Sequence, residues 1–217
     1  MSEQPQVQVT YAVSDGVATI TLDSPHNRNA LSRALVSGLF EALERAAEDD
    51  SARVVVVAAT GSVFCSGADL SEAASGSMEQ GALEIVRLQR VIPFALTEVK
   101  LGLAPAAISL TVFPRMTSRG AALRALGGEV FTAAQAQADG LVTEVVPAEE
   151  LDESVDRVTS SLATGALQGL RETKKLLNAP LVEHLDAHGR DVAALSARLF
   201  GSEEAKEAMT AFLSRKR

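Results

Sequence analysis

The segment Thr60–Leu70, with the sequence TGSVFCSGADL, is the part of the chain whose residue types and spacing could support chemistry. It follows an apolar run typical of a buried strand, contains Gly61 and Gly67, and precedes a predicted helix. At such a junction several backbone N–H groups are unpaired and point towards one place, where the helix dipole adds positive potential. The segment could therefore hold a phosphate or a developing oxyanion. A helix entry that uses glycine for close packing is the alternative.

Other signals for nucleotide, nucleophilic or metal chemistry are weak. Neither GxGxxG nor GxxxxGK[ST] occurs, which excludes the familiar phosphate loops. Cys65 is the single cysteine and has no histidine near it in sequence, which favours a small buried turn residue over a nucleophile. His26, His184 and His188 show no metal-ligand spacing and are predicted to be surface or capping residues. We expect no bound metal.

The elements before this segment are predicted to form a layered α/β arrangement. Alternating apolar residues predict a strand over residues 7–13, and Ser14-Asp15-Gly16 predicts a turn into a second strand at Val17–Leu22. The helix that follows has an apolar stripe and should end at the acidic residues 48–50. Its predicted N-cap is Ser32.

The next strand is predicted at Val54–Ala59, where a continuous, largely β-branched apolar run is typical of a strand buried on both faces. Strand, helix and strand in this order favour an α/β fold with a right-handed crossover. Residues 142–146 could form one further short strand, closed by Pro147. Helical periodicity dominates the rest of the chain, around Leu83–Ile92, Ser118–Leu126, Thr132–Ala138, Glu149–Thr164, Leu167–Leu177, Leu181–Phe200 and Glu203–Arg217. We predict an α/β core over residues 1–145 and a helical region over 146–217.

Length and composition agree with one soluble globular protein. The chain has 217 residues, 47% of them hydrophobic, and a net charge of −8. The negative charge argues against a nucleic-acid partner. No apolar run approaches the length of a membrane span, and the first ten residues lack the basic start and apolar region of a secretory signal. We therefore expect a cytoplasmic protein.

The segment Gly61–Leu70 resembles the first signature of the enoyl-CoA hydratase/isomerase (crotonase) family, which also carries an Asn-Ala-Leu like Asn29-Ala30-Leu31 before its first helix. Further similar segments are FALTEVKLGL (94–103), ADGLV (138–142) and FGSEEAKE (200–207). The similar segments run in order from about residue 7 to the C-terminus, so chance does not explain them.

This resemblance implies a spiral of βαβ units with a helical C-terminal region that forms trimers or dimers of trimers. It also implies acyl-CoA thioesters as substrates, with CoA as part of the substrate and no separate cofactor. In the family two backbone N–H groups stabilise the thioester oxygen as an enolate forms, and by position the N–H of Ala68 would be the first. Glu98 falls where the family places a carboxylate that moves a proton at the acyl carbons, a role for which burial would raise its pKa. The CoA chain would lie against Asn27, Arg28, Asn29, Ser66, Gly67, Ala68, Asp69 and Leu70.

The chain departs from the family between Leu70 and Glu98. There the family inserts a strand, a second glycine-rich turn that supplies the second N–H, and a helix that often supplies a second catalytic Glu. Such an excursion needs about 30 residues or more, which this stretch does not offer. Either the chain has lost a central piece of its sheet, or the sequence omits a segment between about 92 and 94. Omission is favoured because the strand Val54–Ala59 needs neighbours.

The leading hypothesis for function is hydration of a 2-enoyl-CoA. A double-bond shift that uses one Glu, and a non-catalytic CoA-binding or assembly protein on the same scaffold, are the alternatives. A serine peptidase of related fold is discounted because no Ser/His/Asp set lies near the oxyanion turn. An intact mass several kDa above 22.7 kDa would show that residues are missing, and an equal mass would favour the non-catalytic alternative.

Overall fold

The computed structural model describes residues 8–67, 69 and 95–214, which fall into two compact units. Unit 1 consists of Met1–Glu72 and Val146–Asn178, and unit 2 consists of Ala73–Val145 and Ala179–Arg217. The division into residues 1–145 and 146–217 stays a prediction.

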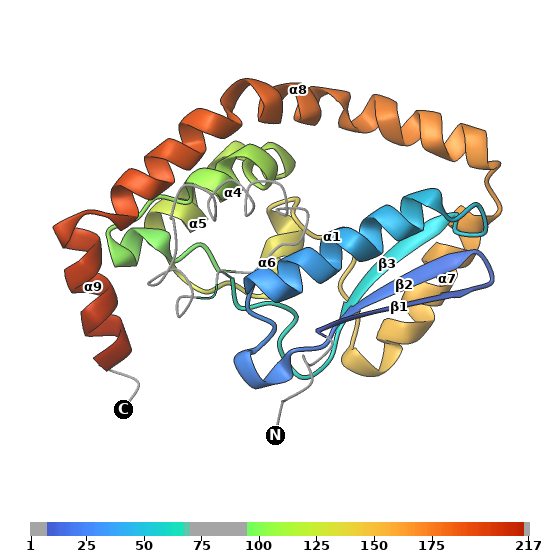
Figure 1. The fold of residues 1–217 in the computed structure, drawn as a ribbon, viewed down its shortest axis with the longest axis horizontal. Coiled ribbons are helices and arrows are strands. Elements are labelled where there is room, and N and C mark those ends of the chain that lie inside the picture. Colours follow the sequence, from blue (N-terminus) through green and yellow to red (C-terminus); the bar gives the residue numbers. More distant parts are fainter. Residues whose placement is uncertain (1–7, 68, 70–94, 215–217) are drawn as a thin grey trace. The chain divides into compact units, whose positions relative to one another are not determined.

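Unit 1 is built on a sheet in the order β1-β2-β3, with β1 at Val9–Ser14, β2 at Val17–Leu22 and β3 at Val54–Ala59 (Figure 1). The predicted hairpin is confirmed: β1 and β2 pair antiparallel through a turn in which Asp15 and Gly16 have positive φ. The predicted crossover is also confirmed, because β2 and β3 are parallel and α1 connects them.

The helix α1, Arg33–Glu48, begins and ends where its sequence predicts. The Ser32 side chain accepts a hydrogen bond from the N–H of Leu35 at 3.2 Å, and Asp49 is the C-cap. Its buried stripe packs against β1 and β2 and includes Leu35, Val36, Leu39, Ala42 and Ala46. Burying one such leucine contributes about 2 kcal/mol, so this stripe fixes the helix on the sheet.

The prediction that β3 is buried on both faces is wrong for the described residues. Val55 is 38% exposed, and the other residues of β3 are half-buried. The physical reason is position, since β3 lies at one end of the described sheet. The helix α7, Leu151–Ala163, packs against β3, and the Arg53 guanidinium donates to the carbonyl of Ala163 at 3.0 Å.

Unit 2 is mostly helical and has its own apolar core. Its first described element is the 3-10 turn η2, Glu98–Leu101, followed by α4, η3, α5 and α6 at Ala106–Thr111, Phe113–Arg115, Ser118–Gly127 and Ala133–Ala138. The buried core comprises Leu96, Ile108, Val112, Met116, Ala121, Phe131, Ala136 and Leu141. The last helix, α9 at Glu203–Ser214, packs against η2.

Two sequence predictions for the helical part need correction. Residues 142–146 form no strand but a loop, because Pro147 follows and no described strand lies beside them. A 3-10 turn, η4 at Ala148–Glu150, precedes α7. The two helices predicted around Leu167–Leu177 and Leu181–Phe200 are one helix, α8, Leu167–Phe200.

The helix α8 continues through Pro180 although proline cannot donate to the carbonyl of Leu176. The side chain of Leu176 is 76% exposed, so solvent can reach this turn and hydrate the freed carbonyl. The predicted helix over Leu83–Ile92 and the residues 215–217 lie outside the described residues. No helix in the described ranges has the length and apolar composition needed to cross a membrane.

Candidate functional site

Two loops of unit 1 are joined to each other at the ends of parallel strands, and we name them the loop pair: residues 23–32 after β2 and residues 60–69 after β3. The N–H of Leu31 donates to the carbonyl of Gly67 at 2.9 Å, and the N–H of Asp69 donates to the carbonyl of Leu31 at 3.4 Å. The Ser66 hydroxyl donates to the carbonyl of Asn27 at 3.3 Å. The structure thus brings together the two segments that were predicted to lie against CoA.

Asn29 fastens the loop pair from within. Its side chain is 0% exposed and its φ is 53°, a left-handed conformation that asparagine tolerates better than most residues. Its Oδ1 accepts from the N–H of Ser24 at 2.8 Å. Its Nδ2 donates to the carbonyls of Thr60 at 2.9 Å and Val63 at 2.8 Å. The amide therefore satisfies three backbone groups at once, one of them buried and two part-buried.

The neighbours of Asn29 face a different environment. Asn27 is half-buried, accepts from the Ser24 hydroxyl at 2.9 Å and donates to Asp69 Oδ2 at 3.4 Å. Arg28 also has a positive φ, 59°, but its side chain is exposed and makes no hydrogen bond or ion pair with a described residue. Arg28 is thus a local cation available to an anion on an otherwise acidic protein.

Gly67 gives the second loop its turn. Its φ is 91°, a conformation that a residue with a side chain rarely adopts. Its N–H donates to the Cys65 sulfur at 3.4 Å. Burial raises the pKa of the Cys65 thiol, which makes Cys65 a poor nucleophile. Ala68 and Leu70 lie outside the described residues, so the oxyanion role of the Ala68 N–H stays a prediction.

Glu98 is the candidate acid or base in unit 2. It is the first residue of η2 and is half-buried, and Leu96 and Leu103, which flank the turn in the sequence, are both buried. Its Oε2 is buried and has no hydrogen-bond partner among the described residues. Desolvation raises the pKa of Glu98 above its ordinary value, and a hydrogen bond from its own backbone N–H offsets part of that rise.

The turn that carries Glu98 is held tightly from two sides. A Cβ on Gly102, whose φ is 67°, would lie 3.2 Å from the backbone N of Ala205 in α9. A Cβ on Gly128 would lie 2.9 Å from Cγ1 of Val99. Real Cβ atoms rarely come so close, so these two glycines let α9 and the end of α5 pack directly on η2. The backbone beneath Glu98 is therefore fixed.

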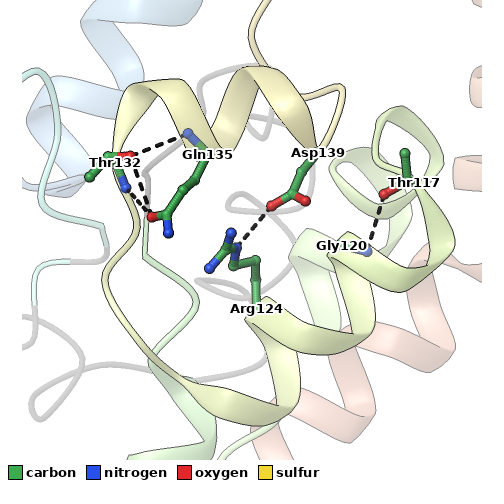
Figure 2. A network of polar contacts seen from close by, with 6 residues as sticks. All are labelled: Thr117, Gly120, Arg124, Thr132, Gln135 and Asp139. Atoms are coloured by element: carbon green, nitrogen blue, oxygen red, sulfur yellow. Dashed lines mark hydrogen bonds and ion pairs between the residues drawn. The ribbon is translucent and has the colours of Figure 1, made fainter.

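The ADGLV segment has a structural role in the same unit. Figure 2 shows the Arg124 Nε donating to Asp139 Oδ2 at 2.9 Å, with side chains only 12% and 16% exposed. The N–H of Thr117 donates to the carbonyl of Asp139 at 2.8 Å. Thr117 caps α5 and Thr132 caps α6, the latter in a capping box with Gln135 (Figure 2). Asp139 thus joins the two capped helices.

Sequence reasoning missed Ser24 as part of the site, and it placed Thr60 in the candidate segment without foreseeing its hydrogen bonds. Ser24 is 0% exposed, and the Thr60 hydroxyl donates to Asp23 Oδ1 at 2.7 Å. Both follow the carboxyl ends of neighbouring parallel strands, where binding residues gather in α/β sheets, and this position was the available signal. His26, His184 and His188 are exposed, as predicted. Within the described ranges no group of three or more potential ligands could hold a metal ion.

Comparison with known proteins gives consistent results. The family model for enoyl-CoA hydratase/isomerase matches residues 12–91 and 82–217. A crystal structure of an enoyl-CoA hydratase from Mycobacterium avium has a TM-score of 0.88 and 37% identity and covers 97% of each chain. The 2,3-dehydroadipyl-CoA hydratase of Escherichia coli is 28% identical over 92% of this chain and 93% of its own. The 1,2-epoxyphenylacetyl-CoA isomerase of E. coli is 26% identical over 94% of each.

The lengths of these alignments exceed the length of the chain that they cover. In the comparison with the E. coli hydratase, 92% of 217 residues is about 200 residues, yet the alignment runs over 237 positions, so about 37 positions have no residue here. The two matches of the family model overlap at residues 82–91, which lie outside the described residues. The chain belongs to the enoyl-CoA hydratase/isomerase family, and its fold is the crotonase fold that the resemblance implied.

Proposed function

We propose that this protein hydrates a 2-enoyl-CoA, with Glu98 moving the proton and the loop pair binding the CoA thioester. The state of Glu98 carries the proposal. A carboxyl group that has a buried oxygen with no partner among the described residues, and whose pKa is raised by desolvation, keeps its proton to a higher pH than an ordinary glutamate and can therefore act as a general acid as well as a base. A glutamate with the ordinary pKa of 4.5 loses its proton at a lower pH, so above that pH it is less often able to donate one.

In this reaction water adds its hydroxyl to the β-carbon of the acyl chain and a proton to the α-carbon. Glu98 takes a proton from the attacking water and returns one to the α-carbon. The N–H of Ala68 holds the thioester oxygen while negative charge develops there. No metal is needed for these steps.

We also propose that the protein works in the cytoplasm as a trimer or a dimer of trimers.

The exposed Arg28 and the loop pair support binding of an anionic CoA. Arg28 stands beside Asn27 and Asn29 and is not committed to a described partner. A cation in this position lets an acidic protein attract phosphate locally. Because CoA carries several negatively charged phosphate oxygens, a single arginine at the binding loops can raise the affinity of the protein for CoA even though the net charge of the protein is negative.

A double-bond shift is the second candidate, since one carboxylate suffices for it. The chain is 26% identical over 78% of its length to a protein named trans-2-decenoyl-[acyl-carrier-protein] isomerase, from Streptococcus mutans, and this similarity favours the double-bond shift. A non-catalytic CoA-binding protein is the third.

The proposal is tested with crotonyl-CoA and the variant Glu98→Gln, which keeps the shape of the side chain and removes the titrating proton. We expect wild-type protein to hydrate crotonyl-CoA and the variant to lose about 10²–10⁴-fold in kcat with little change in CoA binding. A kcat within about twofold of wild type would assign the proton transfer to another group. Saturable CoA binding without activity on any enoyl-CoA would favour the non-catalytic alternative.

A further inference from the structure

We propose that Asn29 is a positioning residue: through its amide it holds residues 60–67 against residues 23–32 and so keeps the loop pair in the conformation that binds the CoA thioester. This inference deepens the proposed function and rests on it for the identity of the ligand. Asn29 was predicted to lie against CoA itself. Its contacts with the protein give its side chain a different task.

The side chain of Asn29 has no free capacity for a ligand. It is 0% exposed, and its oxygen and both amide hydrogens are directed to backbone groups of Ser24, Thr60 and Val63. Its own N–H donates to the carbonyl of Ser24 at 2.9 Å. Every polar atom of the residue's side chain is thus used inside the protein.

The pattern of these bonds requires an amide. One acceptor must face the N–H of Ser24, while two donors must face the carbonyls of Thr60 and Val63. An ionised carboxylate of the same shape offers acceptors only, so it would face two carbonyl oxygens with lone pairs. Alanine would leave all three backbone groups unpaired in a buried place.

The consequence reaches the predicted CoA-binding residues through the backbone. Val63 and Gly67 belong to the same loop, and Gly67 accepts from Leu31, two residues beyond Asn29. Other side-chain bonds also join the two loops. The Thr60 hydroxyl donates to Asp23 Oδ1 at 2.7 Å beside the strand ends, and near the CoA-binding residues the bonds are longer, 3.3 Å from Ser66 to Asn27 and 3.4 Å from Asn27 to Asp69. Asn29 therefore supplies two of the short side-chain links that hold the pair together, at 2.9 Å and 2.8 Å.

The test compares Asn29→Ala and Asn29→Asp with wild type and with Ser37→Ala, a control that removes an exposed hydrogen bond of unit 1. Butyryl-CoA binding is measured by calorimetry at about pH 8 and about pH 5, and each variant is divided by wild type at the same pH. Hydrogen exchange is followed in peptides covering residues 22–35 and 58–67. The loop pair also carries other titratable or charged groups, and division by wild type removes their contribution: Asp23, His26, Arg28, Cys65 and Asp69.

We expect Asn29→Ala to weaken binding about tenfold or more at both pH values and to speed exchange in the two loops but not in the sheet. Asn29→Asp should behave like Asn29→Ala at about pH 8 and regain most of its binding at about pH 5. There its new carboxyl is protonated, because burial raises the pKa, and it can donate one hydrogen bond again. Ser37→Ala should match wild type.

Loop exchange and binding that stay at wild-type levels in both variants would overturn the proposal, and so would an Asn29→Asp protein that matches Asn29→Ala at both pH values. If Asn29→Ala does not fold, the pH response of Asn29→Asp decides alone. If wild-type protein binds no CoA thioester, the proposed function fails. The positioning role is then decided by whether loop exchange in Asn29→Asp slows, relative to wild type, as the pH is lowered.

Discussion

Asn29 in unit 1 and Glu98 in unit 2 are both polar side chains withdrawn from water, and their surroundings differ in kind. Asn29 is neutral, and each of its polar atoms faces a backbone partner at 2.8–2.9 Å. Glu98 can carry a charge, and its Oε2 is buried with no partner among the described residues. The hydrogen-bonding groups of the Asn29 side chain all have partners, whereas Glu98 keeps an oxygen that can still exchange a proton.

This difference separates stability from chemistry. A satisfied buried amide adds stability and fixes geometry, because breaking it exposes several unpaired groups. An unsatisfied buried carboxylate costs stability and shifts its pKa, which is what proton transfer requires. A destabilising group of this kind is retained in a protein when its function requires it. Substitutions at the two positions should therefore change stability in opposite directions.

The largest effect on stability is expected for Asn29→Ala. It removes the side-chain partner of the buried N–H of Ser24 and of the part-buried carbonyls of Thr60 and Val63, so the free energy of unfolding should fall by about 3 kcal/mol. Equilibrium unfolding in urea measures it, with Ser37→Ala as the control. A loss below about 1 kcal/mol would mean that water replaces the amide, contrary to its complete burial.

A smaller effect is expected for Asp139→Asn, where the group is charged but paired. Arg124 and Asp139 are mostly buried, at 12% and 16% exposure, and Arg124 also lies over the ring of Phe131 at 4.8 Å. Asparagine can still accept from the guanidinium, so only the charge is lost, and we expect a decrease of about 1–2 kcal/mol. Urea unfolding compared with the exposed Glu172→Gln control measures it. A change no larger than in the control would show that solvent screens this pair as it screens surface pairs.

The parts of this picture that the sequence predicts are those with local signals. Alternation, the Asp15-Gly16 turn and the Ser32 cap each depend on a few neighbouring residues, and the hairpin, α1 and the β2–β3 crossover follow. The continuity of α8 through Pro180 depends instead on solvent access to one turn, which no local pattern encodes.

The candidate site divides in the same way. The loop pair and Glu98 were found through resemblance, but the task of Asn29 was not, because it depends on carbonyls at Thr60 and Val63, more than thirty residues away. Glu98 alone would be read as a solvated loop residue. Its turn η2 is covered by α9, a helix far away in the sequence. Contacts distant in sequence decide both residues.

The smallest effect on stability, and the one with opposite sign, is expected for Glu98→Gln. The pKa of Glu98 is raised in the folded protein, so between the ordinary pKa of 4.5 and the raised one the native state binds more protons than the unfolded chain. Wild-type stability therefore falls as the pH rises through this window. Glutamine has no proton to lose, so the variant should gain up to about 1 kcal/mol above the window and nothing below it. Urea unfolding at a series of pH values measures the gain.

Glu129→Gln is the matched control, because Glu129 lies in the same unit and its pKa is shifted the other way. Its carboxylate accepts from Lys100 Nζ at 2.8 Å, and this bond and the charge of Lys100 lower the pKa of Glu129. Its contribution to stability is present above the ordinary Glu pKa and is lost as the pH falls through the lowered one. The control should thus be slightly less stable than wild type at neutral pH and equal to it in acid. A Glu98→Gln protein that follows the control, losing stability at neutral pH, would mean that the carboxylate of Glu98 has a partner in the folded protein and is not held ready for proton transfer.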